Sequence, residues 1–281
     1  MRAFISTDLE GLPYVVSFEH TNLKGRLYKE ARRIATKITL IVAEELNMNG
    51  FKEILVADSH GPKVNILIDD LPEYIEIIRG SPRPVSMVAG IKGCDAALFL
   101  GYHAKFGTLR STFDHTYSGG IINQLLVNGI AMSEFLLNTH VAGHFNVPVI
   151  LVAGDAQLIA DDVTQYTPWA ETVALKESLS KFSAKSASMI KIEKELREAV
   201  KRAVTKFKEN KTRPLIMEPP IRTEITFLHT HFADVADLLP EVTRINALKV
   251  EYTTTTAIDT YKIFQLLTIA AAGVSSYFSD I

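Results

Sequence analysis

Histidine and acidic side chains follow three separate apolar segments of the 281-residue chain, each within a few residues of the segment's end. They are Asp8 and Glu10 after residues 3–6, His60 after residues 53–57, and His103 after residues 96–100. Carboxylate oxygens and imidazole nitrogens, without a thiolate, are a ligand set for Zn²⁺ or a similar divalent ion. Such an ion polarises carbonyl groups and lowers the pKa of bound water, so these residue types indicate metal-dependent hydrolysis.

Each of these side chains taken alone has a structural explanation, because an Asp or a His after a strand usually forms a turn or caps a helix. Two further features favour a shared site. Asp8 and Glu10 alternate in an extended segment, so both can face the same side. In an open parallel sheet, ligands bind beyond the carboxyl ends of the strands, where the loops converge. Agreement among three loops therefore favours one metal site over three independent turns.

His115 and Glu134 are further candidates whose roles the spacing leaves open. His115 lies in residues 112–118, a segment without clear periodicity. A histidine there could be a general base, a nucleophile or a transition-state stabiliser, or an exposed loop residue, which the spacing alone favours. Glu134 opens a predicted helix, where the helix dipole favours an acid that has no further role.

Two histidines and two aspartates are weaker candidates. His229 and His231 lie near the end of a predicted strand and could belong to a pocket or an interface. Asp58 and Asp155 each follow an apolar run, where an aspartate either orients a ligand histidine or caps a helix. The sequence does not choose between these roles.

The composition excludes several other classes of protein. Hydrophobic residues make up 47% of the chain and charged residues 22%, as in an ordinary globular protein. The net charge of −2 gives no reason to expect nucleic acid or an anionic membrane as a partner. Cys94 is the one cysteine, so a disulfide within the chain and a multi-cysteine metal cluster are excluded. Neither a phosphate-cradling glycine motif nor a GxSxG nucleophile elbow is present.

Targeting and membrane-spanning segments are not predicted. The N-terminus reaches Asp8 and Glu10 too early for a signal peptide. The most apolar stretch, residues 263–278, is interrupted by polar residues and glycine and falls short of the roughly 20 apolar residues that a spanning helix needs. We therefore expect a soluble, cytoplasmic protein.

The apolar segments predict the scaffold that positions these side chains. Residues 3–6, 53–57, 96–100 and 147–152 are unbroken apolar runs, which are typical of strands covered on both faces. A helical pattern with a period near 3.6 lies between the first two runs, from about residue 24 to residue 49, and Gly50 ends it. Strand, helix and strand in this order form a βαβ unit, so the sheet is predicted to be largely parallel. A second helix is predicted over residues 132–145.

The chain changes character after Asp155. Residues 168–185 are compatible with a strand, residues 188–210 form a charged helix with a solvated face, and residues 213–220 resemble a linker. A strand near 224–228, a short helix, a strand near 245–252 and a helix over 257–273 follow. The predicted fold is a three-layer α/β/α domain with a largely parallel or mixed sheet over residues 1–210, which carries the metal site. A smaller α+β portion, residues 211–281, packs on it.

Several segments in the right order together resemble the zinc-dependent D-aminopeptidase family, typified by the D-aminopeptidase of the dipeptide-permease operon. The likeness extends from residues 6–11 to the C-terminal helix. Its most specific segments are residues 56–60, 98–104, 115–118, 127–129 with Glu134 following, 147–155 and 253–256. Several matched motifs in order are far more specific than any one of them.

The resemblance implies a centre of two Zn²⁺ ions per subunit. It assigns the ligands as Asp8 bridging both metals, Glu10 and His60 completing one, and His103 with Glu134 completing the other. His115 matches the histidine proposed to act directly in catalysis. The family further implies release of N-terminal D-amino acids from short peptides and a homodecamer that encloses the sites.

Two departures from the family pattern concern the margins of the pocket. Ser133 precedes Glu134 where the family usually has glycine, and residues 12–16 are bulkier than the typical small-residue version. Neither departure removes a predicted ligand, so substrate preference is affected more than metal binding. Handedness depends on pocket shape, so D or L preference cannot be read from residue types.

Two alternatives share the same ligands. One is a peptide-binding metalloprotein without turnover, whose enclosed oligomer acts as a receptor. The other is a metal-dependent amidohydrolase that acts on another small amide. His115 is not needed to hold metal in the family arrangement, so its presence favours an enzyme.

Overall fold

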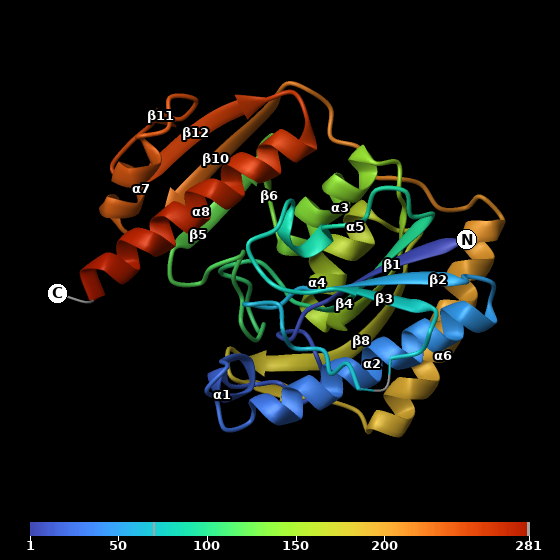
Figure 1. Ribbon diagram of the computed structural model, residues 1–281. Coiled ribbons are helices and arrows are strands. Elements are labelled where there is room, and N and C mark those ends of the chain that lie inside the picture. The colour runs from blue at the N-terminus through green and yellow to red at the C-terminus, as the bar shows by residue number, and fades with distance from the viewer. Residues whose placement is uncertain (70, 280–281) are drawn as a thin grey trace.

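The computed structural model describes residues 1–69 and 71–279, and its larger sheet has seven strands in the order β3-β2-β1-β4-β7-β8-β9 (Figure 1). All neighbours in this sheet pair in parallel except β8 and β9. The strands are β1 (Arg2–Thr7), β2 (Glu53–Asp58), β3 (Ile75–Ile78), β4 (Ala96–Tyr102), β7 (Val149–Asp155), β8 (Glu171–Ser180) and β9 (Ser183–Lys185). The four predicted apolar runs correspond to the adjacent strands β2, β1, β4 and β7, which confirms the largely parallel sheet.

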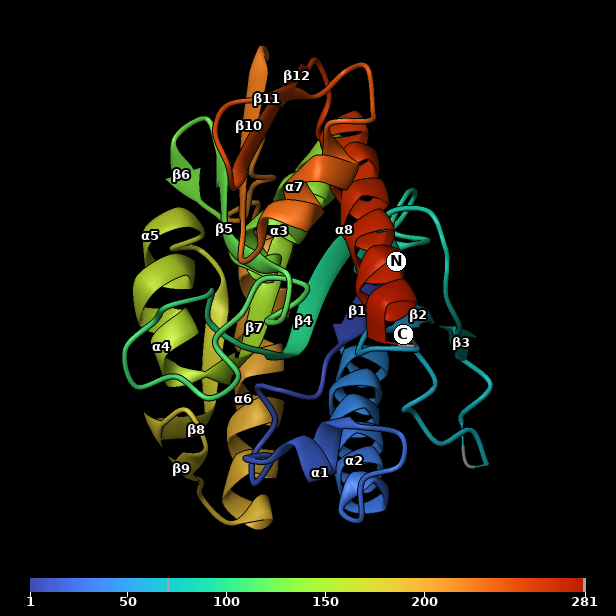
Figure 2. The same ribbon diagram turned by 90° about the vertical axis from the view of Figure 1, so that its left-hand side faces the viewer.

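Helices cover both faces of this sheet (Figures 1 and 2). Helices α2 (Tyr28–Met48) and α6 (Met189–Lys208) pack on one face, and α3 (Glu134–His144) packs on the other. Alternate residues of a strand divide between the faces, so Ala3 and Ile5 contact the α2 and α6 side while Phe4 contacts the α3 side. The predicted three layers are therefore confirmed.

The segment before α2 differs from its prediction. The helix expected from about residue 24 begins at Tyr28, and the short helix α1 (Phe18–Thr21), capped by Ser17, precedes it. Residues between the two helices fold back over α1: Leu27 N donates to Glu19 O at 3.1 Å, and a Cβ on Gly25 would lie 2.2 Å from the same oxygen. The chain is therefore still in a turn where the periodic pattern already reads as helix.

A second, antiparallel sheet has the order β11-β12-β10-β5-β6 and lies in the upper left of Figure 1. Its strands are β5 (Ile122–Val127), β6 (Ile130–Ala131), β10 (Ile221–Phe227), β11 (Thr243–Arg244) and β12 (Lys249–Thr254). Helices α7 (Thr230–Ala236) and α8 (Ala257–Ser279) accompany it, and α8 extends beyond its predicted end. The sheet joins residues from both sides of position 210, and the domain boundary predicted there stays a prediction.

The remaining elements are short. They are η1 (Ser86–Val88) and three consecutive helical turns after β7, namely α4 (Ala156–Leu158), the π-helical η2 (Ile159–Val163) and α5 (Thr164–Tyr166). Among the described residues, no helix is both long and apolar enough to cross a bilayer.

Candidate metal centre

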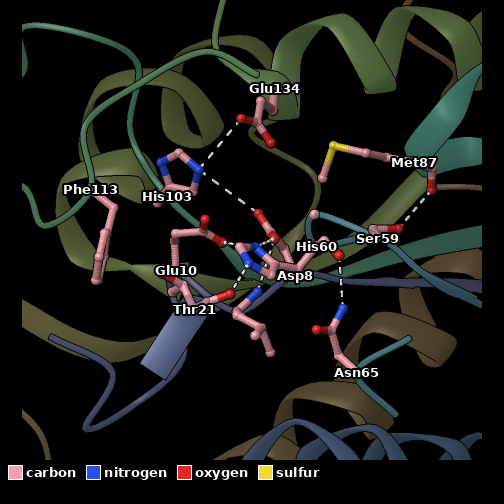
Figure 3. Close-up of polar contacts among 12 residues, drawn as sticks. Asp8, Glu10, Thr21, Ser59, His60, Asn65, Met87, His103, Phe113 and Glu134 are labelled. Carbon is pink, nitrogen blue, oxygen red and sulfur yellow. Dashed lines mark hydrogen bonds and ion pairs between the residues drawn. The ribbon is translucent and has the colours of Figure 1, made fainter. Parts of the chain in front are cut away.

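The six residues singled out in the sequence lie together at the carboxyl edge of the large sheet. Figure 3 shows five of them, Asp8, Glu10, His60, His103 and Glu134. Asp8 and Glu10 follow β1, His60 follows β2 and His103 follows β4, as the strand-end argument predicted. Glu134 is the first residue of α3, and His115 lies in the loop between β4 and β5. These two residues do not follow a strand of the large sheet directly, which is why spacing along the strands left their roles open.

Two glycines allow the loop after β1 to lie directly on the end of β4. Asp8 N donates to Leu100 O at 2.8 Å, and Gly11 N donates to Gly101 O at 2.6 Å. A Cβ on Gly101 would lie 2.1 Å from Asp8 O, and its φ of +72° is itself a conformation that favours glycine. This close approach brings the acids after β1 next to His103.

Asp8 lies between two histidines and presents one carboxylate oxygen to each (Figure 3). His60 Nδ1 is 3.3 Å from Asp8 Oδ1 and 2.7 Å from Glu10 Oε2. On the other side, His103 Nε2 is 3.8 Å from Asp8 Oδ2 and 3.5 Å from Glu134 Oε1. His115 Nε2 is 3.6 Å from the same oxygen of Glu134.

Each of the three histidines donates its other ring N–H to a backbone carbonyl. The bonds run from His60 Nε2 to Thr21 O at 3.0 Å, from His103 Nδ1 to Ala104 O at 3.0 Å, and from His115 Nδ1 to Phe113 O at 2.6 Å. A carbonyl can only accept, so these contacts fix the proton on the outer nitrogen and turn the inner nitrogen toward the carboxylates. Ligand histidines in metal sites are oriented in this way.

Burial and neighbouring charges shift the pKa values of the cluster's carboxyl groups in different directions. Burial together with the neighbouring charge of Glu10 raises the pKa of Asp8 to about 7. Burial also acts on Glu10, but the opposing charge of His60 outweighs it and holds the pKa of Glu10 well below its usual range. For Glu134 the charge of His103 likewise outweighs burial and lowers the pKa.

The histidines divide into two kinds. Burial disfavours the charged ring of His103, but Glu134, Glu10 and Asp8 outweigh it and raise the pKa to about 9. The pKa of His60 is also raised well above its usual range, because Glu10 and Asp8 outweigh burial. Burial and the charge of His103 instead lower the pKa of His115. His115 is therefore the neutral imidazole of the cluster.

The donor set fits a divalent cation. Asp8 Oδ2 and His103 Nε2 are buried, and neither finds a hydrogen-bond partner among the described residues. Two sets of three ligand atoms lie within 4.8 Å of one another, one from Asp8, Glu10 and His103 and one from His103, His115 and Glu134. The second set contains His115, which the family resemblance keeps apart from the metal. An unpaired buried acceptor is costly, and a cation between these atoms would satisfy it.

A small cavity of about 160 Å³ opens among these side chains, lined by Asp8, Glu10, Ser59, His60, Gly61, Lys63, Ser86, Met87, His115, Tyr117 and Glu134. A wider pocket of about 770 Å³ is lined mainly by residues 18–24 and 113–120, and it shares five residues with the inner cavity, namely Glu10, His60, Gly61, His115 and Tyr117. The inner cavity therefore adjoins this wider pocket.

In the part of the chain that the structure describes, the carboxylates of Asp58 and Asp155 accept hydrogen bonds from groups other than the cluster histidines. Asp58 accepts hydrogen bonds from the backbone of Asn65 and Ile66 at 2.5 and 2.7 Å and so shapes the loop after His60. Asp155 accepts from Gln157 N at 2.8 Å, which makes it the cap of α4. Ser133 likewise caps α3 by accepting from Leu136 N at 3.2 Å, so the serine before Glu134 starts the helix well.

Sequence reasoning missed Lys176, a lysine in β8 that is 2% exposed. Its ammonium donates to the carbonyl oxygens of Glu10 and Val15 and so holds the bulky segment after Gly11 against the sheet. Burial lowers the pKa of Lys176 to about 8. The available signal was a lysine that interrupts the apolar residues of its strand.

His229 and His231, the two weaker histidine candidates, stack on each other at the start of α7, with ring centroids 5.5 Å apart.

Comparison with known proteins adds three findings. The model of the family described as D-aminopeptidase matches residues 1–266. A D-aminopeptidase of Bacillus subtilis (strain 168) is 32% identical over 244 residues, which cover 85% of this chain and 86% of the relative. The solved structure of the Zn-dependent D-aminopeptidase DppA from Bacillus subtilis, described as a self-compartmentalizing protease, superposes with a TM-score of 0.91 at 28% identity, over 97% of this chain and 98% of that chain.

Proposed function

The chain belongs to the D-aminopeptidase family, and we propose that it is a zinc-dependent aminopeptidase that removes N-terminal D-amino acids from short peptides or amides. Family membership confirms the resemblance found in the sequence motifs. It also makes the chain a peptidase, which leaves the non-catalytic peptide-binding alternative without support. The observation that carries the zinc proposal is the buried cluster in which Asp8 and His103 present polar atoms without a hydrogen-bond partner among the described residues.

We propose that the cluster binds two ions per subunit, because the contacts of Asp8 divide into two groups. Asp8 directs Oδ1 toward His60 and Oδ2 toward His103, which supports a bridging role for this carboxylate. Glu10 and His60 would complete the ligands of one zinc, and His103 with Glu134 those of the other. Zinc bound there would polarise the scissile carbonyl and lower the pKa of the attacking water.

His115 is the residue we assign to proton transfer. Its Nδ1–H is committed to Phe113 O, its lowered pKa keeps Nε2 unprotonated near neutral pH, and it lines both the inner cavity and the wider pocket. Nε2 would take a proton from the attacking water as the C–O bond forms. The same nitrogen would then return the proton to the leaving amine as the C–N bond breaks.

The size and charge of the inner cavity indicate how a substrate lies in it. A volume of about 160 Å³ corresponds to about five water molecules, which is the scale of one small amino-acid residue. The positively charged N-terminal amine complements the carboxylates of Asp8, Glu10 and Glu134. The rest of the peptide would then extend into the wider pocket, past Phe18 and Phe113.

We further propose that the chain assembles into a closed homo-oligomer, a decamer by family resemblance. The solved structure it resembles is described as self-compartmentalizing. Exposed apolar side chains on α8, Leu266 and Ile269 at 51% each, provide surface that subunit contacts would bury. Light scattering on the purified protein tests this assembly, and a monomer would contradict it. Location in the cytoplasm stays a prediction.

The substrate proposal is tested with matched pairs of D- and L-aminoacyl amides and dipeptides. We expect hydrolysis of the D series, loss of that hydrolysis with a chelator, and recovery when zinc is returned. Cleavage of L substrates alone would contradict the D preference. Activity on amides without an N-terminal amino acid would instead favour an amidohydrolase of another kind.

A further inference from the structure

Lys63 is a buried cation inside the small cavity that holds the cluster. It is 7% exposed and lines the 160 Å³ cavity together with Asp8, Glu10 and Glu134. Among the described residues that line this cavity, it is the one lysine or arginine. A buried ammonium is expensive unless it has partners, so its position in the cavity requires an explanation.

The ammonium of Lys63 has donors to spare. It carries three N–H protons, and its one side-chain hydrogen bond in the described structure runs to Gly61 O at 3.2 Å. Arg83 provides a contrast. Its guanidinium donates to three backbone carbonyls, those of Ile78, Ser86 and Asp58, so its hydrogen bonds serve to connect backbone segments. Lys63 is not used in this way.

The loop that carries Lys63 is held rigidly. Lys63 N donates to His60 O at 2.8 Å, and Gly80 N donates to Lys63 O at 2.9 Å. Asn65 Nδ2 donates to His60 O at 2.8 Å, a bond drawn in Figure 3, and also to Asp58 Oδ1 at 2.6 Å. The position of Lys63 is therefore fixed by the same bonds that fix His60, as expected of a preorganised group.

The backbone of Lys63 is in an unfavourable conformation. Its φ is +61°, in the left-handed region that residues with a Cβ seldom adopt. Such a conformation costs free energy and persists where the surroundings impose it, and residues of this kind concentrate at functional sites. The backbone bonds to His60 and Gly80 hold this conformation at the one lysine or arginine among the described residues that line the cavity.

We propose that Lys63 is a further catalytic residue, whose ammonium donates hydrogen bonds to the scissile carbonyl oxygen and stabilises the negative charge that forms there. This inference rests on the proposed aminopeptidase function. An ammonium repels the substrate's positively charged N-terminal amine, so the amine would lie at the carboxylates. In so small a cavity, the carbonyl oxygen of the same residue is then the group that can accept a hydrogen bond from Lys63. The C-terminal carboxylate of a dipeptide would lie farther out, in the wider pocket.

The step balances without a change in Lys63. The oxygen of water bonds to the carbonyl carbon while His115 accepts the water's proton, and the carbonyl π pair moves onto the oxygen that faces Lys63. Collapse re-forms the C=O bond and breaks the C–N bond, and His115 gives its proton to the amine that leaves. Lys63 keeps its proton throughout and acts by hydrogen bonding alone.

The test uses the zinc-loaded full chain with Lys63→Met, and Lys63→Arg as the variant that keeps the charge. Exposed Lys185, paired with Glu177, provides the matched control Lys185→Met. Turnover is measured on D-alanyl-D-alanine and on D-alaninamide, which lacks a carboxylate. Calorimetry measures binding of a phosphinic tetrahedral analogue of the dipeptide and of D-alanine, and mass spectrometry measures zinc content.

For Lys63→Met we expect kcat to fall about 10²–10³-fold on both substrates while KM stays within about 3-fold. Affinity for the phosphinic analogue should fall by a similar factor, with D-alanine binding, zinc content and melting temperature unchanged. Lys63→Arg should recover part of the loss, and Lys185→Met should behave as wild type.

Three results would overturn the inference. Lys63→Met could keep wild-type turnover with zinc bound, or lose activity on the dipeptide alone, which would make Lys63 a carboxylate-binding residue. It could also lose zinc and melt at a lower temperature, with turnover falling only in proportion to the zinc lost, which would make the residue structural. A wild-type protein that cleaves neither D nor L substrates would instead overturn the proposed function itself, whatever the variants do.

Discussion

His103 and His140 are both buried histidines, 1% and 8% exposed, yet their surroundings shift their pKa values in opposite directions. His103, after β4, faces the carboxylates of Asp8, Glu10 and Glu134, and its pKa is raised to about 9. His140, on α3, faces no such group, and burial lowers its pKa to about 4. Each has a ring nitrogen without a hydrogen-bond partner in the described structure.

The difference between these two residues shows how a histidine in a candidate metal site differs from a histidine in the hydrophobic core. Burial is the same in kind, so the neighbours decide what the ring does. Around His103 an excess of negative charge converges on unsatisfied ligand atoms, which only a cation relieves. The ring of His140 packs in the core, and its nitrogen without a hydrogen-bond partner lowers the stability of the folded state. Substitutions at the two positions should therefore fail in different ways.

The largest expected effect comes from His103→Ala. Removing this proposed ligand, which faces both Asp8 and Glu134, should lower zinc content and reduce turnover more than about 10⁴-fold, since bound metal would supply a large part of the acceleration. His140→Ala is the matched control in the core and should keep both zinc and turnover, though with lower stability. Mass spectrometry of the purified variants measures zinc, and a His103→Ala protein that keeps its full zinc would contradict the ligand assignment.

His115→Ala separates the proton-transfer role from metal binding. We expect turnover to fall about 10³-fold, the scale of general acid–base catalysis, with zinc content unchanged. His115 also belongs to a set of three candidate ligand atoms with His103 and Glu134. Loss of zinc from His115→Ala would therefore reassign it as a ligand and would move the proton shuttle elsewhere.

His140 should weaken the fold in acid. Its folded-state pKa of about 4 lies below the ordinary histidine value of 6.5, so the unfolded chain binds the proton more readily. Stability from the neutral ring is complete above pH 6.5 and is lost as pH falls toward 4, by up to about 3 kcal/mol. Urea unfolding of wild type and His140→Leu across this range measures the difference, and parallel curves would refute the assignment.

Asp8→Asn should have a smaller effect, of opposite sign in the two metal states. In the chelated protein it removes one of three crowded carboxylates, so we expect unfolding to cost about 2 kcal/mol more. With zinc added, wild type should gain stability by binding the metal, and the variant should not. Thermal unfolding with and without chelator measures both. Equal stabilisation of both proteins by zinc would show that Asp8 is not a ligand.

The sequence predicted the part of the site that depends on strand ends. Four apolar runs became four adjacent parallel strands, and parallel strands bring their carboxyl ends to one edge. Asp8, Glu10, His60 and His103 could be grouped on that basis alone. Glu134 and His115 could not, because α3 and the loop after β4 reach the edge through tertiary packing that no spacing encodes. Their grouping came from family resemblance.

The remaining differences have identifiable causes. Asn128 and Gly129 both have positive φ and form the two-residue turn between β5 and β6, an Asn-Gly signal that could have predicted this hairpin. That the hairpin joins β10, nearly a hundred residues later, is a long-range pairing beyond local pattern. The proposed role of Lys63 could not be predicted from the sequence, because it depends on where a loop with positive φ places this residue in the folded protein.

Zinc titration of the chelated wild-type protein tests the central claim most directly. Calorimetry should show two equivalents bound per chain, and hydrolysis of a D-aminoacyl substrate should return in step with their binding. Zinc binding that is absent, or activity on D substrates that stays unchanged after complete removal of metal, would contradict the account of the buried cluster as a catalytic metal centre.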